Sequence, residues 1–256
     1  MIENKNIDTR ITHCIKEKNV AVFDLDGTLV KGDLGETLFF TLLMLRAKKL
    51  SISEIDKLPE MLIQEDFVSS ISETREMKLL ELYAQLLKNK QFNLAYDITN
   101  LYIENFGKSK IIEASLAVLR AFSSKAYILE FDNLSVTFFV KQNEMILSYI
   151  LRLLQEDEVI TYIVSASPQI VIDSFCQIFK LENVKRIGVS FNEPIIPYGK
   201  EKVKILNKNK IYKWELAFGN SSGDLQMLLE SEFAVLCNPK EKSLIKIAEE
   251  QNWEVI

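Results

Sequence analysis

One short stretch, residues 20–30 with the sequence VAVFDLDGTLV, most constrains the fold of this 256-residue chain. Its apolar first half is typical of a buried strand, and such a strand has no reason to end in two carboxylates unless something there requires negative charge. Asp24 and Asp26 are two residues apart, so on an extended backbone their side chains point the same way. Gly27 allows a sharp turn, and Thr28 is expected to satisfy amide groups within it. The stretch predicts a site at a strand end.

Beyond residue 140, strand-like and helix-like segments alternate and are joined by short loops. This pattern is typical of parallel strands joined by crossover helices that cover both faces of a sheet. We therefore predict an α/β fold with a Rossmann-like parallel sheet. Ser167 is the expected N-cap of the helix after the second strand, with Pro168 in its first turn. The predicted strands are 19–25, 159–167, 184–191, 213–219, 233–237 and a short 252–256; the predicted helices are 144–155, 168–180, 200–210, 225–232 and 239–251.

The block from residue 33 to residue 140 has a different character. It is poor in Gly and Pro, and helical spacing of apolar residues recurs at 34–49, 74–89 and 92–106. The stretch 126–140 fits neither the strand–helix alternation nor the helical pattern well, and it could be a strand or the return crossing to the α/β part. We predict two domains: an α/β core formed by residues 1–32 and 141–256, and an inserted helical cap domain formed by residues 33–140.

Several polar side chains fall at the predicted strand ends. Asp24, Ser165 and Asn220 each follow an apolar strand pattern directly. In open parallel sheets, ligands bind at the carboxyl ends of the strands. We expect these three side chains to face one site.

The motif FDLDGTLV resembles the first motif of the haloacid dehalogenase-like superfamily, whose phosphatases use an Asp nucleophile and Mg²⁺. The stretch TYIVSAS resembles the second motif and supplies Ser165. The stretch YGKEKVKIL resembles the third motif, a lysine near a helix start; its form favours Lys202 over Lys200 and Lys204. The stretch FGNSSGDLQML resembles the fourth motif, with Asn220 in place of the usual first carboxylate. The insertion after the first motif is similar to the helical cap of the phosphoserine phosphatase-like branch.

This resemblance implies a Mg²⁺-dependent phosphatase that hydrolyses a small phosphomonoester through an aspartyl phosphate. Asp24 would be the nucleophile and Asp26 the acid and base, with the second carboxylate arguing against dehalogenation. Asn220 keeps an amide oxygen for Mg²⁺ but removes one negative charge, so weaker metal binding is expected. The implied residues are Asp24, Asp26 and Lys202 for catalysis; Gly27, Asp33, Ser165, Ala166 and Lys202 for substrate or phosphate; and Asp24, Asp26, Asn220 and Asp224 for the metal.

Two alternatives stay open. The same motifs would serve a phosphotransferase that passes phosphate to an alcohol, and Asn220 would suit a protein of low activity that binds a phosphorylated ligand. Asp33 has two interpretations as well. It fits a capping box with Glu36 at the start of the helix at 34–49, or it could contact a substrate amino group, as the resemblance to phosphoserine phosphatases implies. We expect Lys108 and Lys110 to be solvated.

Composition and net charge indicate which kinds of binding partner to expect. A net charge of −5 and a pI near 5.2 argue against a broad basic surface for nucleic acid, so we expect a small phosphorylated metabolite as the partner. His13 is the only histidine, which disfavours a His base or a His-bound metal. The most apolar run, 38–45, is too short to cross a membrane, and three scattered cysteines are typical of reduced thiols in a cytoplasmic protein. The sequence does not predict the oligomeric state.

Overall fold

The computed structural model describes residues 5–17, 19–131, 134–155, 159–190 and 195–256. Three predictions extend beyond these ranges. They are the core domain at residues 1–4, the stretch 126–140 at residues 132–133 and the strand 184–191 at residue 191. Within them, no helix is both long enough and apolar enough to cross a lipid bilayer.

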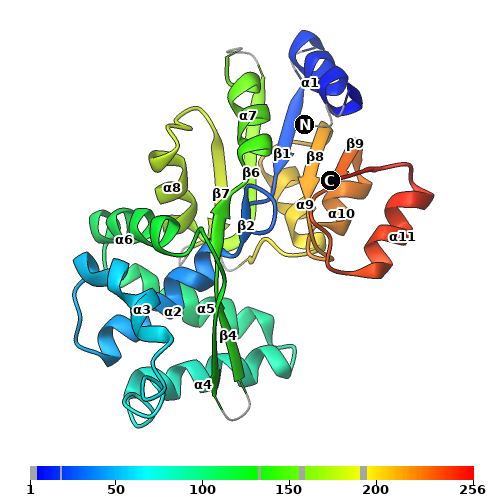
Figure 1. The fold of residues 1–256 in the computed structure, drawn as a ribbon. Coiled ribbons are helices and arrows are strands. Elements are labelled where there is room, and N and C mark those ends of the chain that lie inside the picture. Colours follow the sequence, from blue (N-terminus) through cyan, green and yellow to red (C-terminus); the bar gives the residue numbers. More distant parts are fainter. Residues whose placement is uncertain (1–4, 18, 132–133, 156–158, 191–194) are drawn as a thin grey trace.

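A parallel sheet with the strand order β10-β9-β8-β1-β6-β7 lies in the upper part of the molecule as drawn in Figure 1. Each pair of neighbouring strands is parallel, which confirms the predicted α/β fold. The order places the strand before Asp24 between the strand that carries Ser165 and the strand before Asn220. The strands are β1 (Val20–Phe23), β6 (Ile160–Pro168), β7 (Lys185–Val189), β8 (Trp214–Gly219), β9 (Ser231–Leu236) and β10 (Glu254–Val255).

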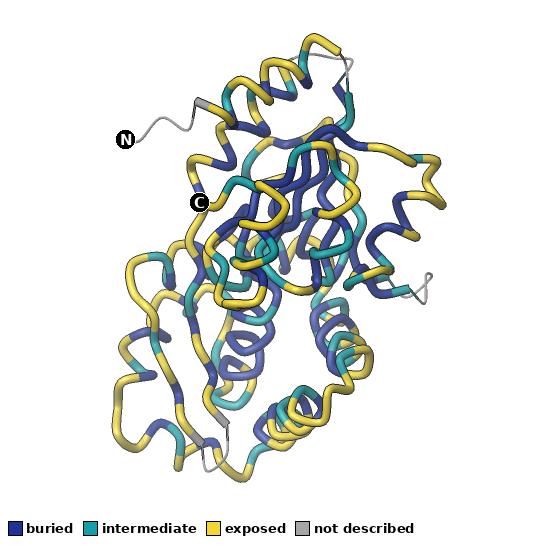
Figure 2. The backbone as a smooth tube through the Cα atoms, turned by 90° about the vertical axis from the view of Figure 1, so that its right-hand side faces the viewer, coloured by how far each residue is buried: buried dark blue, intermediate teal, exposed yellow. Residues whose placement is uncertain are grey.

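Helices cover both faces of this sheet, as predicted. Along β1, Ala21 and Phe23 pack on one face and Val22 on the other, because successive side chains of a strand alternate. The first face is covered by α1 (Lys5–Glu17), α7 (Glu144–Leu153) and α8 (Gln169–Ile178). The second face is covered by α9 (Lys200–Lys208), α10 (Leu225–Leu229) and α11 (Lys242–Glu250). Figure 2 shows the buried residues concentrated in the strands between these helices.

The sequence analysis missed α1. Ile7, Ile11 and Cys14 are fully buried and follow a spacing of four and then three residues, which places them on one helix face. The polar residues around them hid this pattern. The helix therefore belongs to the layer that covers the first face of the sheet.

The segment between β2 (Val30–Gly32) and β5 (Val140–Gln142) forms a second group of elements, and these two strands pair antiparallel. The helix α2 has an unbroken run of buried residues at 37–45, so it lies at the centre of this group. The ambiguous stretch 126–140 forms the hairpin β3–β4 followed by β5. The elements are α2 (Leu34–Ala47), the 3₁₀ helix η1 (Ile52–Lys57), α3 (Leu58–Leu62), α4 (Arg75–Lys88), α5 (Phe92–Glu104), α6 (Lys108–Ala121), β3 (Tyr127–Phe131) and β4 (Leu134–Phe138).

Candidate active site

The turn after β1 holds Asp24 at the centre of the sheet's edge. The Asp24 amide donates to the carbonyl of Phe218 on β8, at 2.9 Å, so the backbone is still tied to the sheet at this residue. Gly27 then adopts a φ of +80°, which favours glycine. The expected role of the Thr28 hydroxyl was wrong. Within the described residues its Oγ1 has no hydrogen-bond partner, while its backbone amide donates to Leu25.

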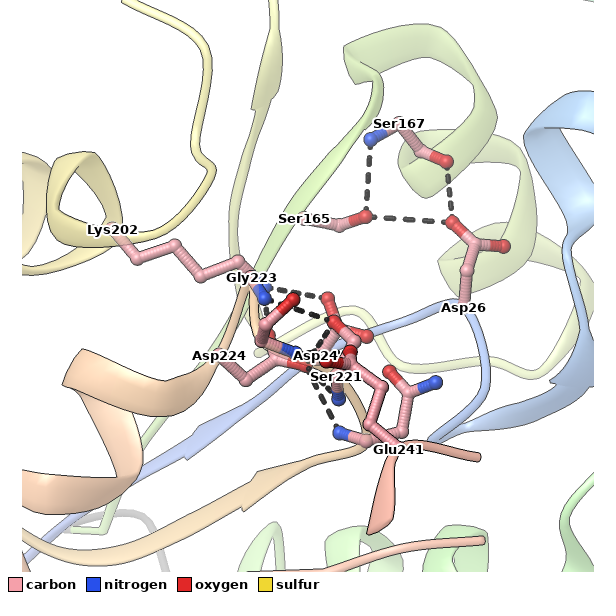
Figure 3. A network of polar contacts seen from close by, with 11 residues as sticks. Asp24, Asp26, Ser165, Ser167, Lys202, Ser221, Gly223, Asp224 and Glu241 are labelled. Atoms are coloured by element: carbon pink, nitrogen blue, oxygen red, sulfur yellow. Dashed lines mark hydrogen bonds and ion pairs between the residues drawn. The ribbon is translucent and has the colours of Figure 1, made fainter. Parts of the chain in front are cut away.

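Lys202 joins two carboxylates at the bottom of the site. Its Nζ lies 2.6 Å from Asp24 Oδ1 and 2.6 Å from Asp224 Oδ1, and all three side chains are buried (Figure 3). It comes from the first turn of α9, which follows Gly199. Lys204, two residues further on, is exposed and pairs with Glu201 instead. Of the three lysines considered in the sequence, Lys202 is therefore the one that the start of α9 places at the two carboxylates.

Burial governs the protonation of this group. Loss of solvent and the nearby Asp224 raise the pKa of Asp24 to about 8, although Lys202 acts in the opposite direction. Burial lowers the pKa of Lys202, but the two carboxylates more than offset this and leave it above its ordinary value. Lys202 is therefore a fixed positive charge at neutral pH, and it is shared between two acids.

Asp26 is held by contacts to both of its carboxylate oxygens. The backbone amide of Leu34, at the start of α2, donates to Oδ1 at 2.6 Å. The hydroxyl of Ser167 donates to Oδ2 at 2.5 Å, and the hydroxyl of Ser165 lies 3.5 Å from the same oxygen (Figure 3). Burial and the charge of Asp33 raise the pKa of Asp26 to about 7. Asp26 can thus gain or lose a proton near neutral pH.

The predicted role of Ser167 as a helix cap was wrong. The strand β6 continues to Pro168, which takes the N-cap position of α8, and no side chain caps this helix. Ser165 and Ser167 are two residues apart on the extended end of β6, and the amide of Ser167 donates to the Ser165 hydroxyl at 3.0 Å. Both hydroxyls therefore approach Asp26.

The loop after β8 is built around Asp224. Its Oδ2 accepts hydrogen bonds from the amide of Asn220 at 2.9 Å and from the amide and hydroxyl of Ser221, each at 3.1 Å. Its Oδ1 accepts from Lys202. Both oxygens of Asp224 thus have protein donors, and Asp224 holds the loop and the lysine together.

The side-chain amide of Asn220 lies against the carbonyl oxygen of Asp26. The amide atom that faces this carbonyl is 2.9 Å from it and 3.3 Å from Asp224 Oδ2. If this atom is the amide nitrogen, both contacts are hydrogen bonds. If it is the oxygen, two acceptors face each other, and a cation beside them would be needed to relieve the repulsion. Gly27 is required here, because a Cβ at that position would lie 1.9 Å from the Asn220 amide.

A cavity of about 190 Å³ brings these groups together. Two tyrosines that the sequence analysis did not select, Tyr96 on α5 and Tyr198 before α9, form part of its wall. Phe92, also on α5, stacks on Tyr198 with ring centroids 5.8 Å apart. Aromatic residues at helical spacing, as in 92–106, usually belong to a core, and nothing in the sequence around Tyr198 indicated a cavity. The other lining residues are Asp24, Asp26, Asp33, Ser165, Ala166, Ser167, Pro197, Lys202, Asn220, Ser221, Gly223 and Asp224.

Asp33 has one of its two expected roles in the structure. Its Oδ1 accepts from the amide of Glu36 at 2.6 Å and caps α2, as predicted. The reciprocal half of a capping box is replaced, because the Glu36 carboxylate accepts from the hydroxyl of Tyr83 at 2.7 Å. Asp33 also lines the cavity, so a contact with substrate stays a prediction. Lys108 and Lys110 are exposed at the start of α6, in agreement with a solvated position.

The residues available to a metal are of mixed type. Over the described part of the chain, no three His, Cys, Asp or Glu side chains are placed to share one ion. A divalent cation at this site would instead need oxygens of different kinds: the Asp24 carboxylate, the Asp26 carbonyl and the Asn220 amide.

Comparisons with known proteins define the fold. No family model matches the chain, and no curated protein matches it. A conserved protein of unknown function from Anaerococcus prevotii DSM 20548 is similar over 98% of this chain and 91% of its own, with a TM-score of 0.61 and 15% identity. A protein of unknown function from Bordetella pertussis Tohama I is similar over 93% and 97%, with a TM-score of 0.60 and 15% identity. Both share the fold of this chain.

A third structure, a hydrolase of the haloacid dehalogenase-like family from Streptococcus pneumoniae, matches over 89% of this chain and 90% of its own. Its TM-score is 0.45 at 14% identity.

Proposed function

We propose that this protein is a phosphatase of the haloacid dehalogenase-like superfamily that hydrolyses a small phosphomonoester through an aspartyl phosphate. One observation carries the proposal: Asp24 and Asp26 open into the same cavity, one paired with a buried lysine and the other held by two hydrogen-bond donors. A pair of carboxylates in such different surroundings suits two roles, a nucleophile and an acid.

In the first step, an oxygen of ionised Asp24 attacks phosphorus, and the bond from phosphorus to the ester oxygen breaks. The ionised form is favoured by Lys202, which acts against the burial that raises the pKa of Asp24. Lys202 contacts Asp24 Oδ1, so Oδ2 is the oxygen we assign to the attack. The departing alcohol takes the proton of Asp26, whose pKa near 7 allows it to carry one at neutral pH. In the second step, Asp26 accepts a proton from water, which attacks phosphorus and breaks its bond to Asp24.

Ser165 and Lys202 would hold the non-bridging phosphate oxygens. Both line the cavity next to Asp24, and Lys202 is the buried positive charge of the group. A phosphate dianion beside two aspartates needs such compensation. Because Asp224 already uses both of its oxygens, we assign it to positioning Lys202 and the 220–221 amides rather than to direct metal contact.

The residue types at this point suit Mg²⁺. The side-chain amide of Asn220 lies against the carbonyl of Asp26, with 2.9 Å between the amide atom and the carbonyl oxygen. Carboxylate, carbonyl and amide oxygens are the ligands that such hard cations prefer in proteins. We propose Asp24, the Asp26 carbonyl and Asn220 as the protein ligands. A bound Mg²⁺ would neutralise phosphate charge and favour attack by Asp24.

The cavities at the site suit a small substrate. The cavity that Asp24 lines has a volume of about 190 Å³, and a second cavity of about 430 Å³ shares Asp26, Asp33 and Asn220 with it. Tyr96 and Tyr198 close the first cavity on the side of the inserted helices. We therefore propose a small metabolite as the substrate and expect no nucleic acid to reach Asp24.

Phosphate release from a panel of small phosphomonoesters tests the proposal, measured with Mg²⁺, with chelator and with the Asp24→Asn variant. We expect release that requires both the metal and Asp24. An Asp24→Asn enzyme with full activity would refute the mechanism. If phosphate passed to an added alcohol instead of water, the protein would be a phosphotransferase. If the folded protein bound phosphomonoesters without turnover, it would be a binding protein.

A further inference from the structure

We propose that Ser167 is a positioning residue that aims the proton of Asp26 at the leaving oxygen of the substrate. This inference rests on the proposed function and gives a role to Ser167, a residue of the second motif stretch to which the resemblance assigns none. It follows from where the Ser167 hydroxyl lies and from what surrounds it.

The first step concerns the Asp26 carboxylate. A carboxylic acid transfers its proton well only when the oxygen that carries it faces the acceptor. Without restraint, the carboxyl group of Asp26 would rotate about its terminal bond, which has a broad energy minimum. Leu34 fixes Oδ1 by its backbone amide, and Ser167 fixes Oδ2 by its hydroxyl. The two contacts come from different segments and hold the plane of the group.

The second step concerns the selectivity of these contacts. Ser165 and Ser167 lie on the same end of β6, yet they meet Asp26 differently. The Ser167 hydroxyl is 2.5 Å from Oδ2, and the Ser165 hydroxyl is 3.5 Å from it. The Ser165 oxygen accepts from the amide of Ser167, and both serines line the cavity that Asp24 also lines. The short contact therefore engages the Ser167 hydroxyl with Asp26, whereas Ser165 makes only a long contact with it and is the serine we assign to phosphate.

The third step concerns the space around the Ser167 hydroxyl. A Cβ at Gly35, in the first turn of α2, would lie 2.6 Å from Ser167 Oγ. A Cβ at Gly188 on β7 would lie 2.8 Å from the carbonyl oxygen of Ser167. Glycine at both positions lets Ser167 sit between α2 and β7, where its hydroxyl reaches Asp26. The start of α2 thus contributes both a donor to Asp26, from Leu34, and room for the second donor.

The test uses the basicity of the leaving group. A glycerol oxygen needs a proton as it departs from phosphorus, whereas p-nitrophenolate is weakly basic and depends on it much less. The ratio of kcat/KM for glycerol phosphate to that for p-nitrophenyl phosphate therefore measures proton delivery in the first step. For Ser167→Ala we expect kcat/KM for glycerol phosphate to fall about 10–100-fold, with a clearly smaller fall for p-nitrophenyl phosphate.

Ser165→Ala is the matched control on the same strand. Because Ser165 is assigned to phosphate, which both substrates carry, its removal should lower kcat/KM for the two by similar factors. On an Asp26→Asn background, Ser167→Ala should change kcat/KM for glycerol phosphate by less than about threefold, since its effect acts through Asp26. Equal losses for both substrates in Ser167→Ala, or full additivity with Asp26→Asn, would overturn the inference.

Gly35→Ala provides a second variant that keeps the hydroxyl and displaces it. Alanine suits the start of a helix, and the closest contact of its new Cβ is Ser167 Oγ. We expect the same selective loss with glycerol phosphate, and this variant decides the matter if Ser167→Ala does not fold. The proposed function fails separately, if wild-type phosphate release does not depend on Asp24.

Discussion

The ammonium group of Lys202 lies 2.6 Å from Asp24 Oδ1, and both side chains are almost completely buried. The same ammonium contacts Asp224 at the same distance. One positive charge therefore balances two carboxylates that come from separate strand ends, β1 and β8. This arrangement links the stability of the fold to the chemistry of the site.

Replacing Lys202 by Met should remove activity and destabilise the protein. It leaves two buried carboxylates without a partner, and loss of one member of a buried ion pair costs about 3–5 kcal/mol. The loss should be smaller at pH 5.5, where Asp24, with a pKa of about 8, takes up a proton. Urea unfolding of the wild type and the variant measures the loss in free energy of unfolding at pH 8 and at pH 5.5.

Lys204→Met is the control for this prediction. Lys204 is exposed and pairs with Glu201 on the surface, so its loss should change the free energy of unfolding by less than about 0.5 kcal/mol. Equal destabilisation by the two variants would contradict the assignment of Lys202.

The metal-free protein should become less stable as the pH rises from about 4 to 8. Asp24 and Asp26 have pKa values of about 8 and about 7 in the fold, against 3.8 ordinarily, chiefly because of burial. The folded state therefore binds more protons than the unfolded state in this range, and stability is lost as the pH passes through these values. Thermal unfolding in chelator, across this range, measures the slope.

Asp26→Asn should make the fall of stability with pH shallower, because it removes one of the two carboxyl groups whose pKa is raised. Asp56→Asn, on the exposed Asp56–Arg120 pair, should leave it as in the wild type. A wild-type protein whose stability rises steadily from pH 4 to pH 8 would contradict these pKa assignments.

Asn220→Asp should strengthen Mg²⁺ binding. The change adds a negative charge at a proposed ligand, and we expect the Kd for Mg²⁺ to fall about tenfold. Without metal, the same variant should be less stable than the wild type, since the new carboxylate would face Asp26 O and Asp224. Calorimetric titration measures the Kd for Mg²⁺, and thermal unfolding in chelator measures the stability of the metal-free variant. An unchanged Kd would argue against Asn220 as a ligand.

Gly27→Ala should cost more than the same change at Gly107. Both glycines have positive φ angles, +80° and +77°, so alanine strains the backbone at each by about 1 kcal/mol. Only at Gly27 would the new Cβ strike another group, the Asn220 amide at 1.9 Å; around Gly107 nothing lies within 4 Å. Chemical unfolding compares the two variants. Equal losses in the free energy of unfolding would show that the contact with Asn220 is unimportant.

The sequence indicated the sheet and most of the site because each depends on local patterns. The apolar run before Asp24 predicts a buried strand, and its carboxylates mark where that strand ends. Parallel order then brings Asp24, Ser165 and Asn220 to one edge, as the strand order β8-β1-β6 shows. Lys202 was selected by motif, and the start of α9 places it at Asp24.

The parts that the sequence analysis missed depend on contacts between distant segments. Ser167 looked like a helix cap because serine before proline favours that position, but its hydroxyl meets Asp26, 141 residues away in sequence. Tyr198, in the wall of the cavity, stacks on Phe92 only because α5 folds back towards the sheet. The local secondary-structure preferences of the sequence do not predict such contacts between distant segments.

The most direct test of the central claim is to identify the residue that becomes phosphorylated. The enzyme would be mixed with a ³²P-labelled phosphomonoester and Mg²⁺, quenched in acid within the first turnover and digested, and the labelled peptide sequenced. We predict a hydroxylamine-sensitive label on Asp24 that is absent from Asp24→Asn and lasts longer in Asp26→Asn. Turnover without a labelled protein, or a label on another residue, would contradict the proposed mechanism.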